Sequence, residues 1–437
     1  MSGLERQRSI YLRGVGGERP RVPVEFAKLE ARARRAMSEE AFAYVSAGAG
    51  GERTMRRNVA AFDDARIVPR MLRDVSRRDT SVELFGRRLA SPLLLAPIGV
   101  LEMAHPEADL AVARAARAQG VPMIISNQAS RPMEAIAAEL GDSPRWFQLY
   151  WSTSDELVAS FVARAERSGA EAIVVTLDTT ILGWRTRDLD VAYLPFLRGK
   201  GIAQYTSDPV FERLISSGRN AERGGEQEAD VAADQTPPPS LPALKTLVQL
   251  VRAYPERFPR ALLSGRARGA VERFVEIYSR PSLTWDDLPF LRERTKLPIV
   301  LKGILHPDDA RRAVEAGMDA VVVSNHGGRQ VDGAIATIEA LPGVVDAVAG
   351  RLPVLLDSGI RGGADAFKAI ALGATAVCVG RPYVYGLAAG GERGVAEVIA
   401  NHAAELDLTM GLAGYRSLAD VGPEALAGQA AAAGSSR

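Results

Sequence analysis

Eight short apolar runs, separated by segments with a helical pattern, follow one another from about residue 90 onward. Apolar runs of about four to eight residues are typical of strands buried on both faces, as in a parallel sheet. Strands that alternate with helices predict such a sheet, and eight strands are the number that closes a (β/α)8 barrel. The expected strands are Pro92–Ala96, Pro122–Ser126, Trp146–Tyr150, Ala172–Asp178, Pro298–Lys302, Ala320–Ser324, Pro353–Asp357 and Ala376–Gly380.

Helix-like stretches connect these runs, among them Pro106–Gln119, Asp155–Ser168, Pro307–Ala316 and Gly363–Leu372. An open doubly wound sheet is the competing architecture, but no dinucleotide-binding glycine pattern follows the first strand. We therefore expect an α/β protein in which residues 1–437 form a single TIM-barrel domain.

Three regions depart from the strand–helix rhythm. Residues Val24–Gly48 have a helical pattern that stops at a glycine-rich segment, and we expect an N-terminal helical segment there. A long insertion, residues 186–284, separates the fourth and fifth strands, and it is expected to be a lid or an oligomer contact. Within it, Gly218–Pro239 is polar and lacks aromatic residues, which favours mobility. The tail, residues 423–437, is expected to be flexible.

Charge and cysteine content exclude several classes of function. The formal net charge is +1 and no long basic block occurs, so neither nucleic acid nor a membrane is an expected partner. Cys378 is the only cysteine, which rules out an intrachain disulfide and a multi-cysteine zinc site, and no metal is expected. Its apolar surroundings indicate a buried structural thiol. The sequence shows neither a long apolar span nor a signal peptide, which favours the cytoplasm.

Polar residues gather where the expected strands end, and this is the end at which barrel enzymes carry their active sites. Because the carboxyl ends of all eight strands open on one face, these residues are expected to surround a single pocket. In strand order they are Gly99, Ser126, Gln148 and Tyr150, Thr176 and Asp178, Lys302, His326 and Arg329, Asp357 to Arg361, and Gly380 with Arg381.

The segment Ser324-Asn-His-Gly-Gly-Arg-Gln directly follows the sixth strand. His326 supplies a base that titrates near neutral pH, and Arg329 supplies a two-bond clamp for a carboxylate. A base and a carboxylate clamp three residues apart suggest chemistry on a small organic acid. The other histidines are weaker candidates, because His105 and His306 each precede a proline that opens a helix and His402 lies on the last helix.

Glycine-rich turns with arginines follow the last two strands, in Asp357-Ser-Gly-Ile-Arg-Gly-Gly and in Gly380-Arg-Pro. Barrel enzymes often bind a phosphate there through backbone N–H groups and a helix N-terminus. Gly359, Gly380, Arg361 and Arg381 would complete such a site. The motif alone leaves open whether the phosphate belongs to a substrate or to a cofactor.

Together these motifs resemble the FMN-dependent 2-hydroxy-acid dehydrogenases and oxidases. The same strand-end order is found in Ala96-Pro-Ile-Gly, Phe147-Gln-Leu-Tyr, Val175-Thr-Leu-Asp-Thr and Leu301-Lys-Gly, and the resemblance extends from about Phe42 to Arg393. Within that family, the long insertion and Gly99 are most similar to the lactate 2-monooxygenases.

The resemblance implies FMN as the cofactor and assigns roles to individual residues. His326 would accept a proton, by a hydride or a carbanion route, and Asp178 would stabilise the resulting imidazolium. Arg329 and Tyr44 would hold the substrate carboxylate, with Arg185 nearby, and Tyr150 would contact the hydroxyl oxygen. Lys302 would lie beside the flavin ring. The remaining cofactor contacts would come from Pro97, Ile98, Gly99, Ser126, Gln148, Thr176, Asp357, Ser358, Gly359, Arg361, Gly380 and Arg381.

The resemblance also implies the reaction. A short L-2-hydroxy acid, L-lactate above all, would react with O2 to give acetate, carbon dioxide and water, in a homotetramer or larger assembly. Gly99 would leave room for oxygen near the reactive face, or it would simply satisfy a tight turn after Pro97. A plain oxidase, a dehydrogenase with another acceptor, and a flavin- or phosphate-binding barrel without turnover are the alternatives.

Overall fold

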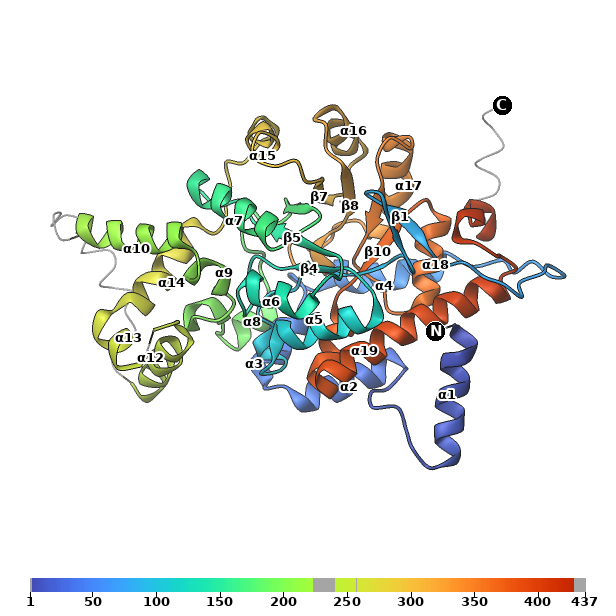
Figure 1. Ribbon diagram of the computed structural model, residues 1–437, viewed down its shortest axis with the longest axis horizontal. Helices are drawn as coiled ribbons and strands as arrows, with labels where there is room; N and C mark the ends of the chain where they lie inside the picture. Colours follow the sequence, from blue (N-terminus) through green and yellow to red (C-terminus); the bar gives the residue numbers. More distant parts are fainter. Residues whose placement is uncertain (1, 223–239, 257, 428–437) are drawn as a thin grey trace.

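The computed structural model describes residues 2–222, 240–256 and 258–427. Eight parallel strands close into a barrel in which each strand pairs with its neighbours in chain order (Figure 1). The expected (β/α)8 barrel is therefore confirmed. Its strands are β3 (Leu93–Leu95), β4 (Met123–Ile125), β5 (Arg145–Leu149), β6 (Ile173–Thr176), β7 (Ile299–Ile304), β8 (Ala320–Val323), β9 (Val354–Leu356) and β10 (Ala376–Val379).

The barrel strands read as unbroken apolar runs because both of their faces are buried. Along β3, Leu93 and Leu95 pack against the helical layer, whereas Leu94 belongs to the cluster that fills the barrel. Cys378 lies in that inner cluster and is buried and unpaired, as expected for a structural thiol. Burial raises the pKa of this thiol well above its usual range.

Helices cover the outside of the barrel, and the four expected connections are all helical. The longest helix, α19, bends at Gly391, whose φ of +61° is a conformation that favours glycine. The covering helices are α5 (Ala108–Gln119), α6 (Met133–Leu140), α7 (Asp155–Arg167), α15 (Leu288–Arg292), α16 (Pro307–Glu315), α17 (Thr337–Val348), α18 (Gly363–Ala371) and α19 (Arg381–Leu412).

The N-terminal region is more divided than the sequence indicates. The expected helical segment consists of α2 (Phe26–Ala36) and α3 (Glu39–Ser46), which are separated because the side chain of Ser38 caps the second helix. The helices α1 (Gly3–Val15) and α4 (Arg53–Asp64) flank them.

A short antiparallel hairpin of β1 (Val82–Leu84) and β2 (Arg87–Leu89) precedes the barrel. Leu84 and Leu89 pack into the inner cluster, and the Phe85 ring lies 5.4 Å from that of Trp146. The hairpin therefore covers the end of the barrel opposite the carboxyl ends of the strands.

The insertion between β6 and β7 is helical and lies to one side of the barrel (left in Figure 1). After the residues outside the description, the insertion resumes as a helix, α12. Of the segment Gly218–Pro239, residues 223–239 lie outside the described residues, and residues 218–222 continue α10. The described helices are α8 (Thr186–Asp190), α9 (Ala203–Thr206), α10 (Pro209–Glu222), α12 (Leu241–Ala253), α13 (Phe258–Ser264) and α14 (Arg266–Ile277).

Short 3-10 turns complete the described chain. They are η1 (Leu101–Met103), η2 (Pro195–Arg198), η3 (Trp285–Asp287), η4 (His326–Gly328), η5 (Leu418–Asp420) and η6 (Pro423–Ala425). The packed chain continues past Pro423, where the sequence predicts a flexible tail, because Ala425 and Leu426 are buried. Residues 428–437 of that tail lie outside the described residues.

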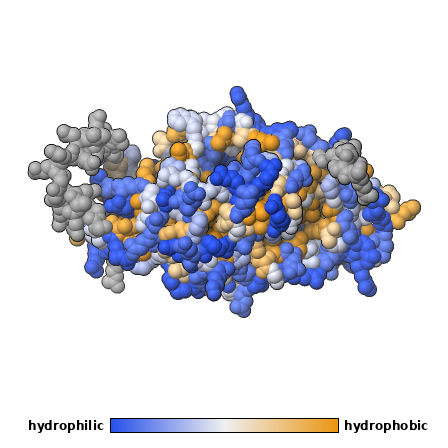
Figure 2. Space-filling model, turned by 90° about the horizontal axis from the view of Figure 1, so that it is seen from above, coloured by the Kyte–Doolittle hydropathy of each residue, from blue (hydrophilic) through white to orange (hydrophobic). Residues whose placement is uncertain are grey.

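The surface is that of an ordinary globular protein. Figure 2 shows a face on which hydrophilic residues predominate and apolar residues occur in smaller groups between them. Among the helices that the structure describes, none is both long and apolar enough to cross a membrane.

Candidate active site

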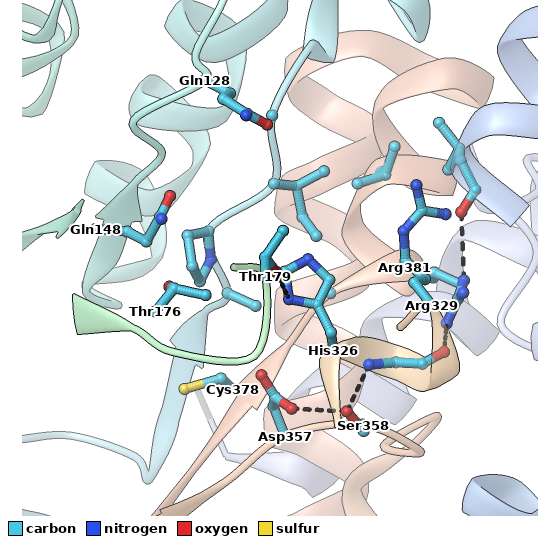
Figure 3. Close-up of a pocket in the computed structure, with 18 of the residues that line it drawn as sticks. Gln128, Gln148, Thr176, Thr179, His326, Arg329, Asp357, Ser358, Cys378 and Arg381 are labelled. Atoms are coloured by element: carbon cyan, nitrogen blue, oxygen red, sulfur yellow. Dashed lines mark hydrogen bonds between the residues drawn. The ribbon is translucent and has the colours of Figure 1, made fainter. Parts of the chain in front are cut away.

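One cavity at the carboxyl ends of the barrel strands brings together nearly all of the predicted site residues (Figure 3). Ser126 and Asp178 do not line the cavity, but each contacts a residue that does. Ser126 donates a hydrogen bond to Gln148, and Asp178 accepts one from His326. The predicted residues that line the cavity are Tyr44, Pro97, Ile98, Gly99, Gln148, Tyr150, Thr176, Arg185, Lys302, His326, Arg329, Asp357, Ser358, Gly359, Arg361, Gly380 and Arg381.

His326 is presented to the cavity by the sharp turn after β8. Its φ of +57° is unusual for a residue with a side chain, and its backbone N–H is held by the Ser324 hydroxyl at 3.1 Å. The Nδ1 atom lies 2.7 Å from a carboxylate oxygen of Asp178, which can only accept, so Nδ1 carries the proton in the neutral ring. Nε2 is then left as a base. Burial lowers the pKa of His326, which keeps the ring neutral near pH 7.

Asp178 is a charged partner for that ring. One of its oxygens also accepts a hydrogen bond from Thr179 at 3.0 Å, and the other lies 3.8 Å from the Lys302 ammonium. Burial alone would raise the pKa of Asp178, but Lys302 and His326 hold it well below its usual range. Asp178 can therefore stabilise a positive charge that forms on His326.

Lys302 places a fixed positive charge in the floor of the cavity. It projects from β7, donates to Ser324 at 2.8 Å and pairs with Asp357 at 3.1 Å. Burial opposes its charge, but Asp357 and Asp178 raise the pKa of Lys302 above its usual range. The ammonium is thus protonated at neutral pH.

Four arginines line the cavity without an ion pair to any carboxylate in the described part of the chain: Arg185, Arg329, Arg361 and Arg381. They donate instead to backbone carbonyls, as Arg329 does to Tyr44 and Arg381 to Ala47. Burial, together with Arg185, lowers the pKa of Arg329 to about 9, and burial together with Arg381 lowers that of Arg361 to about 10. Desolvated cations of this kind are stabilised by anions.

The cations form two adjoining groups, which meet where Arg329 and Arg381 both donate to the Ala47 carbonyl, and this suggests two anion sites side by side. Arg329 lies beside Arg185 near His326, while Arg361 and Arg381 follow β9 and β10. At the second group the backbone of Gly380 stands at the N-terminus of α19, and a Cβ there would meet no atom closer than 3.6 Å. This open backbone and the two guanidinium groups fit a phosphate. The first group fits a carboxylate.

Several polar atoms of the residues that line the cavity have no partner in the described structure. Gln148 Nε2 and Thr176 Oγ1 are buried without a hydrogen bond, and both residues line the cavity. Arg361 Nε, at the phosphate end, is likewise unpartnered. An isoalloxazine ring offers carbonyl oxygens and ring nitrogens that could satisfy such atoms, so the residues present fit the FMN that the sequence predicts.

The structure adds a close contact at Gly99 that the sequence does not show. A Cβ on this residue would lie 2.9 Å from the Cβ of Gln128 and 3.0 Å from its carbonyl oxygen. Gly99 therefore serves a close approach between the segments that follow β3 and β4, where Val100 N–H also bonds to Gln128 at 2.9 Å. An added methyl group would act on the cavity through Gln128, which lines it, rather than by simply filling space beside the reactive face.

Sequence reasoning missed several cavity residues. Gln128 and Thr179 had a usable signal, since each lies within two residues of a predicted site residue at the same strand end. Leu182, Phe196 and Tyr278 had none, because they reach the cavity only through the fold of the insertion and its edges. Of the weaker histidines, His105 and His306 accept bonds from nearby backbone N–H groups, which is the local role expected of them.

The chain matches known proteins over most of its length. A family model described as FMN-dependent dehydrogenase matches residues 33–428. The chain is 40% identical over 409 residues to an L-lactate oxidase of Lysinibacillus sphaericus, with 94% of each protein covered. It is 39% identical over 395 residues to a 4-hydroxymandelate oxidase of Amycolatopsis orientalis, covering 90% of this chain and 96% of that protein. A crystal structure of mandelate oxidase matches with a TM-score of 0.71 and 36% identity, over 92% of this chain and 97% of that one.

Proposed function

The chain belongs to the FMN-dependent dehydrogenase family, whose members use FMN to oxidise 2-hydroxy acids, and on this premise we propose that its own substrate is a short L-2-hydroxy acid, L-lactate above all. The observation that carries the proposal is the pairing of a neutral, carboxylate-oriented His326 with the unpaired cation of Arg329 in one cavity. A base beside a carboxylate site is what the oxidation of a 2-hydroxy acid requires.

In this proposal each residue has one task. Arg329 and Arg185 bind the substrate carboxylate, and the Tyr150 hydroxyl donates a hydrogen bond to the oxygen of the substrate's 2-hydroxyl group. Burial and then the charge of Asp178 raise the pKa of Tyr150, so that it keeps its proton. His326 Nε2 accepts one proton from the substrate. Bound FMN supplies a two-electron acceptor.

Bulky apolar side chains form one wall of the cavity, where the substrate side chain would lie. Phe196 and Tyr278, from the insertion and its C-terminal edge, line the same space as Tyr44 and Leu182. The rings of Tyr44 and Phe196 meet edge to face at 6.4 Å. The similarity to L-lactate oxidase supports lactate, and the similarity to 4-hydroxymandelate oxidase makes an aromatic 2-hydroxy acid the second candidate substrate.

For the fate of the reduced enzyme we propose reaction with O2 and, as the first candidate, coupled decarboxylation to acetate, carbon dioxide and water. The insertion supports this outcome, because residues that close over a cavity delay the release of pyruvate. The second candidate is an oxidase that releases pyruvate and hydrogen peroxide, and it is supported by the similarity to oxidases.

One experiment separates these outcomes. The FMN-loaded protein is reduced with L-lactate without oxygen, oxygen is admitted, and acetate, pyruvate and peroxide are measured. Acetate as the main product supports the monooxygenase, and pyruvate with peroxide supports the oxidase. A yellow protein whose colour L-lactate and other short 2-hydroxy acids cannot bleach would contradict the proposed substrate class.

Arg329→Lys should weaken L-lactate binding by about ten- to a hundredfold while leaving FMN content unchanged. The guanidinium donates to the carbonyl oxygens of Tyr44 at 2.6 Å and Ala47 at 2.9 Å, and a lysine cannot make these bonds and grip a carboxylate as well. The dissociation constant comes from anaerobic reduction at increasing lactate. Arg351→Lys is the control, because Arg351 also donates to two carbonyls but lies outside the cavity. Equal constants in the two variants would place the carboxylate elsewhere.

Gly99→Ala should lower the ratio of acetate to pyruvate and slow anaerobic reduction much less. The new methyl group must displace Gln128, and both residues line the cavity, so the space beside the reacting groups changes while His326 and Arg329 stay in place. The measurement is the product ratio at matched turnover. In Gly14→Ala the new methyl group has no neighbour within 4 Å, and this control should keep the native ratio. If the ratio of acetate to pyruvate is the same in both variants, Gly99 does not influence product release.

A further inference from the structure

We propose that the insertion positions the cofactor-facing side of the cavity through a set of hydrogen bonds centred on Asn127. These bonds, here called the relay, join Asn127 to Tyr205 of the insertion, to the Gln148 side chain and to the Tyr150 backbone. Tyr205 belongs to the insertion and Asn127 to the segment after β4, and neither lines the cavity. The inference rests on the proposed function for the role of Tyr150. For Gln148 it rests only on the binding of FMN.

Asn127 is the centre of the relay and is completely buried. Its backbone N–H donates to Gln148 Oε1 at 3.0 Å. Its side-chain Oδ1 accepts two bonds, one from the backbone N–H of Tyr150 at 3.0 Å and one from the Tyr205 hydroxyl at 3.3 Å. A single asparagine thus links the ends of β4 and β5 to the insertion.

The relay determines which side of the Gln148 amide faces the cavity. Gln148 Oε1 accepts hydrogen bonds from the Asn127 backbone N–H and the Ser126 hydroxyl. The oxygen of the amide therefore points toward these residues and away from the cavity. Nε2 is left buried, unpartnered and available to a bound group. The N–H that holds Gln148 Oε1 belongs to the Asn127 backbone, and the Asn127 side chain fixes this backbone through its bonds to the Tyr150 N–H and the Tyr205 hydroxyl. If that backbone shifts, the amide can rotate and its N–H is no longer directed, so Asn127 and Tyr205 are positioning residues that act on Gln148 through the backbone.

Tyr205 is held by packing on every side of its ring. It makes edge-to-face contacts with Phe161 of α7 at 5.0 Å and Phe274 of α14 at 4.8 Å, and it lies 5.4 Å from Phe211. The ring is fully buried, and burial raises the pKa of its hydroxyl, which stays protonated and donates to Asn127. Because the ring is packed independently of its hydroxyl, the hydroxyl can be removed without opening a large cavity.

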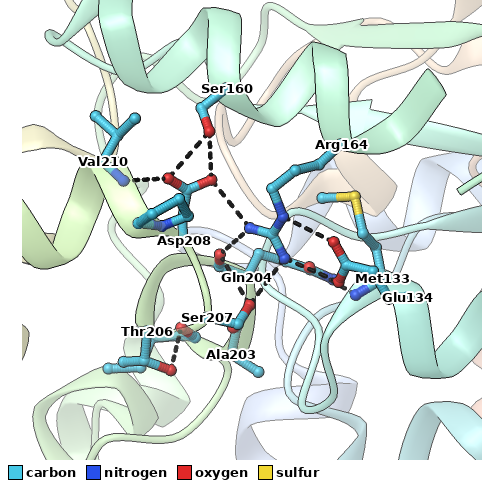
Figure 4. Close-up of polar contacts among 12 residues, drawn as sticks. Met133, Glu134, Ser160, Arg164, Ala203, Gln204, Thr206, Ser207, Asp208 and Val210 are labelled. Carbon is cyan, nitrogen blue, oxygen red and sulfur yellow. Dashed lines mark hydrogen bonds and ion pairs between the residues drawn. The ribbon is translucent and has the colours of Figure 1, made fainter. Parts of the chain in front are cut away.

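A buried network of ion pairs and hydrogen bonds attaches residues before and after Tyr205 in the chain to the helices around the barrel (Figure 4). Arg164 of α7 donates to the Gln204 carbonyl at 2.7 Å and to Asp208 at 3.0 Å, and Asp208 also accepts from Ser160 at 2.8 Å. The side chain of Gln204 is held as well, because its Oε1 accepts a hydrogen bond from the backbone N–H of Met133 at 2.9 Å. The turn that carries Tyr205 is thus attached to α6 and α7, so its hydroxyl has a defined position relative to Asn127.

The test removes single hydroxyl or acceptor atoms. Tyr205→Phe should raise the dissociation constant of FMN, titrated into apoprotein by fluorescence, by about two- to tenfold and alter the visible spectrum of the bound flavin. Asn127→Leu, which removes the shared acceptor, should have a larger effect on both and should also slow anaerobic reduction by L-lactate. Asn127→Asp, which keeps an acceptor oxygen at the same place, should restore most of the affinity that Asn127→Leu loses.

Tyr254→Phe is the matched control, because the Tyr254 hydroxyl is also inside the insertion but donates to Glu212 and not to the barrel. It should leave the FMN dissociation constant and spectrum unchanged. If Tyr205→Phe behaves like Tyr254→Phe in both readouts, or only lowers the melting temperature, the relay is refuted. Failure of L-lactate as a substrate would contradict the proposed function, but it would leave the FMN readouts of this test intact.

Discussion

His326→Ala is expected to retain FMN and to lose at least about a hundredfold of the rate at which L-lactate reduces the flavin. Among the described residues that line the cavity, His326 is the imidazole, and a carboxylate sets the position of its proton through the 2.7 Å contact with Asp178. Alanine removes the base without touching the phosphate end of the cavity. Stopped-flow reduction without oxygen measures the rate, and absorbance of the purified protein measures FMN content.

His306→Ala is the control for this variant. His306 also follows a barrel strand and accepts a backbone N–H, but it is exposed and lies outside the cavity. Its substitution should leave the reduction rate unchanged. Near-native reduction in His326→Ala would mean that another group accepts the proton, and the proposed mechanism would then be wrong.

The pH dependence of the native protein should report the same group. Burial lowers the pKa of His326 below its ordinary value of 6.5, although the charge of Asp178 opposes the shift. The neutral ring is the active form, so the rate of reduction should decline at acid pH, with the midpoint of the decline below 6.5. That acid limb should be absent from the residual rate of His326→Ala.

The sequence predicted the barrel well because of how its strands are buried. Parallel strands covered on both faces must be apolar throughout, and runs such as Ala320–Val323 are short and unambiguous. Once the barrel is recognised, the carboxyl ends of the strands must share a face, so His326, Lys302 and Gln148 could be placed in one cavity before any coordinates were known.

What could not be predicted depends on contacts between segments far apart in the chain. The hairpin β1–β2 has strands of only three residues, and Arg87 and Arg88 hide its apolar pattern. The sequence around Asn127 does not show that this residue joins several hydrogen bonds, because only the fold brings its partners Tyr150 and Tyr205 to it. The contact at Gly99 could not be predicted for the same reason, since the atoms nearest to its missing Cβ belong to Gln128.

The second large effect is expected from Lys302→Met. Methionine has a similar length but no charge, so two carboxylates that Lys302 neutralises, Asp357 at 3.1 Å and Asp178 at 3.8 Å, would stay buried without their cation. Removing one partner of a buried ion pair typically costs about 3–5 kcal/mol. We expect the free energy of unfolding to fall by that order and FMN to be bound weakly or lost. Denaturant unfolding and FMN titration measure the two effects.

A second substitution separates stability from chemistry. Asp357→Asn in the Lys302→Met background removes one of the two stranded carboxylates and should recover part of the unfolding free energy. It should not recover the rate of flavin reduction, because the positive charge in the cavity floor is still missing and Asp178, the partner of His326, still lacks the cation that keeps its pKa low. Full recovery of the rate in the double variant would show that Lys302 only balances charge, and native unfolding of Lys302→Met alone would show that the ion pair contributes nothing.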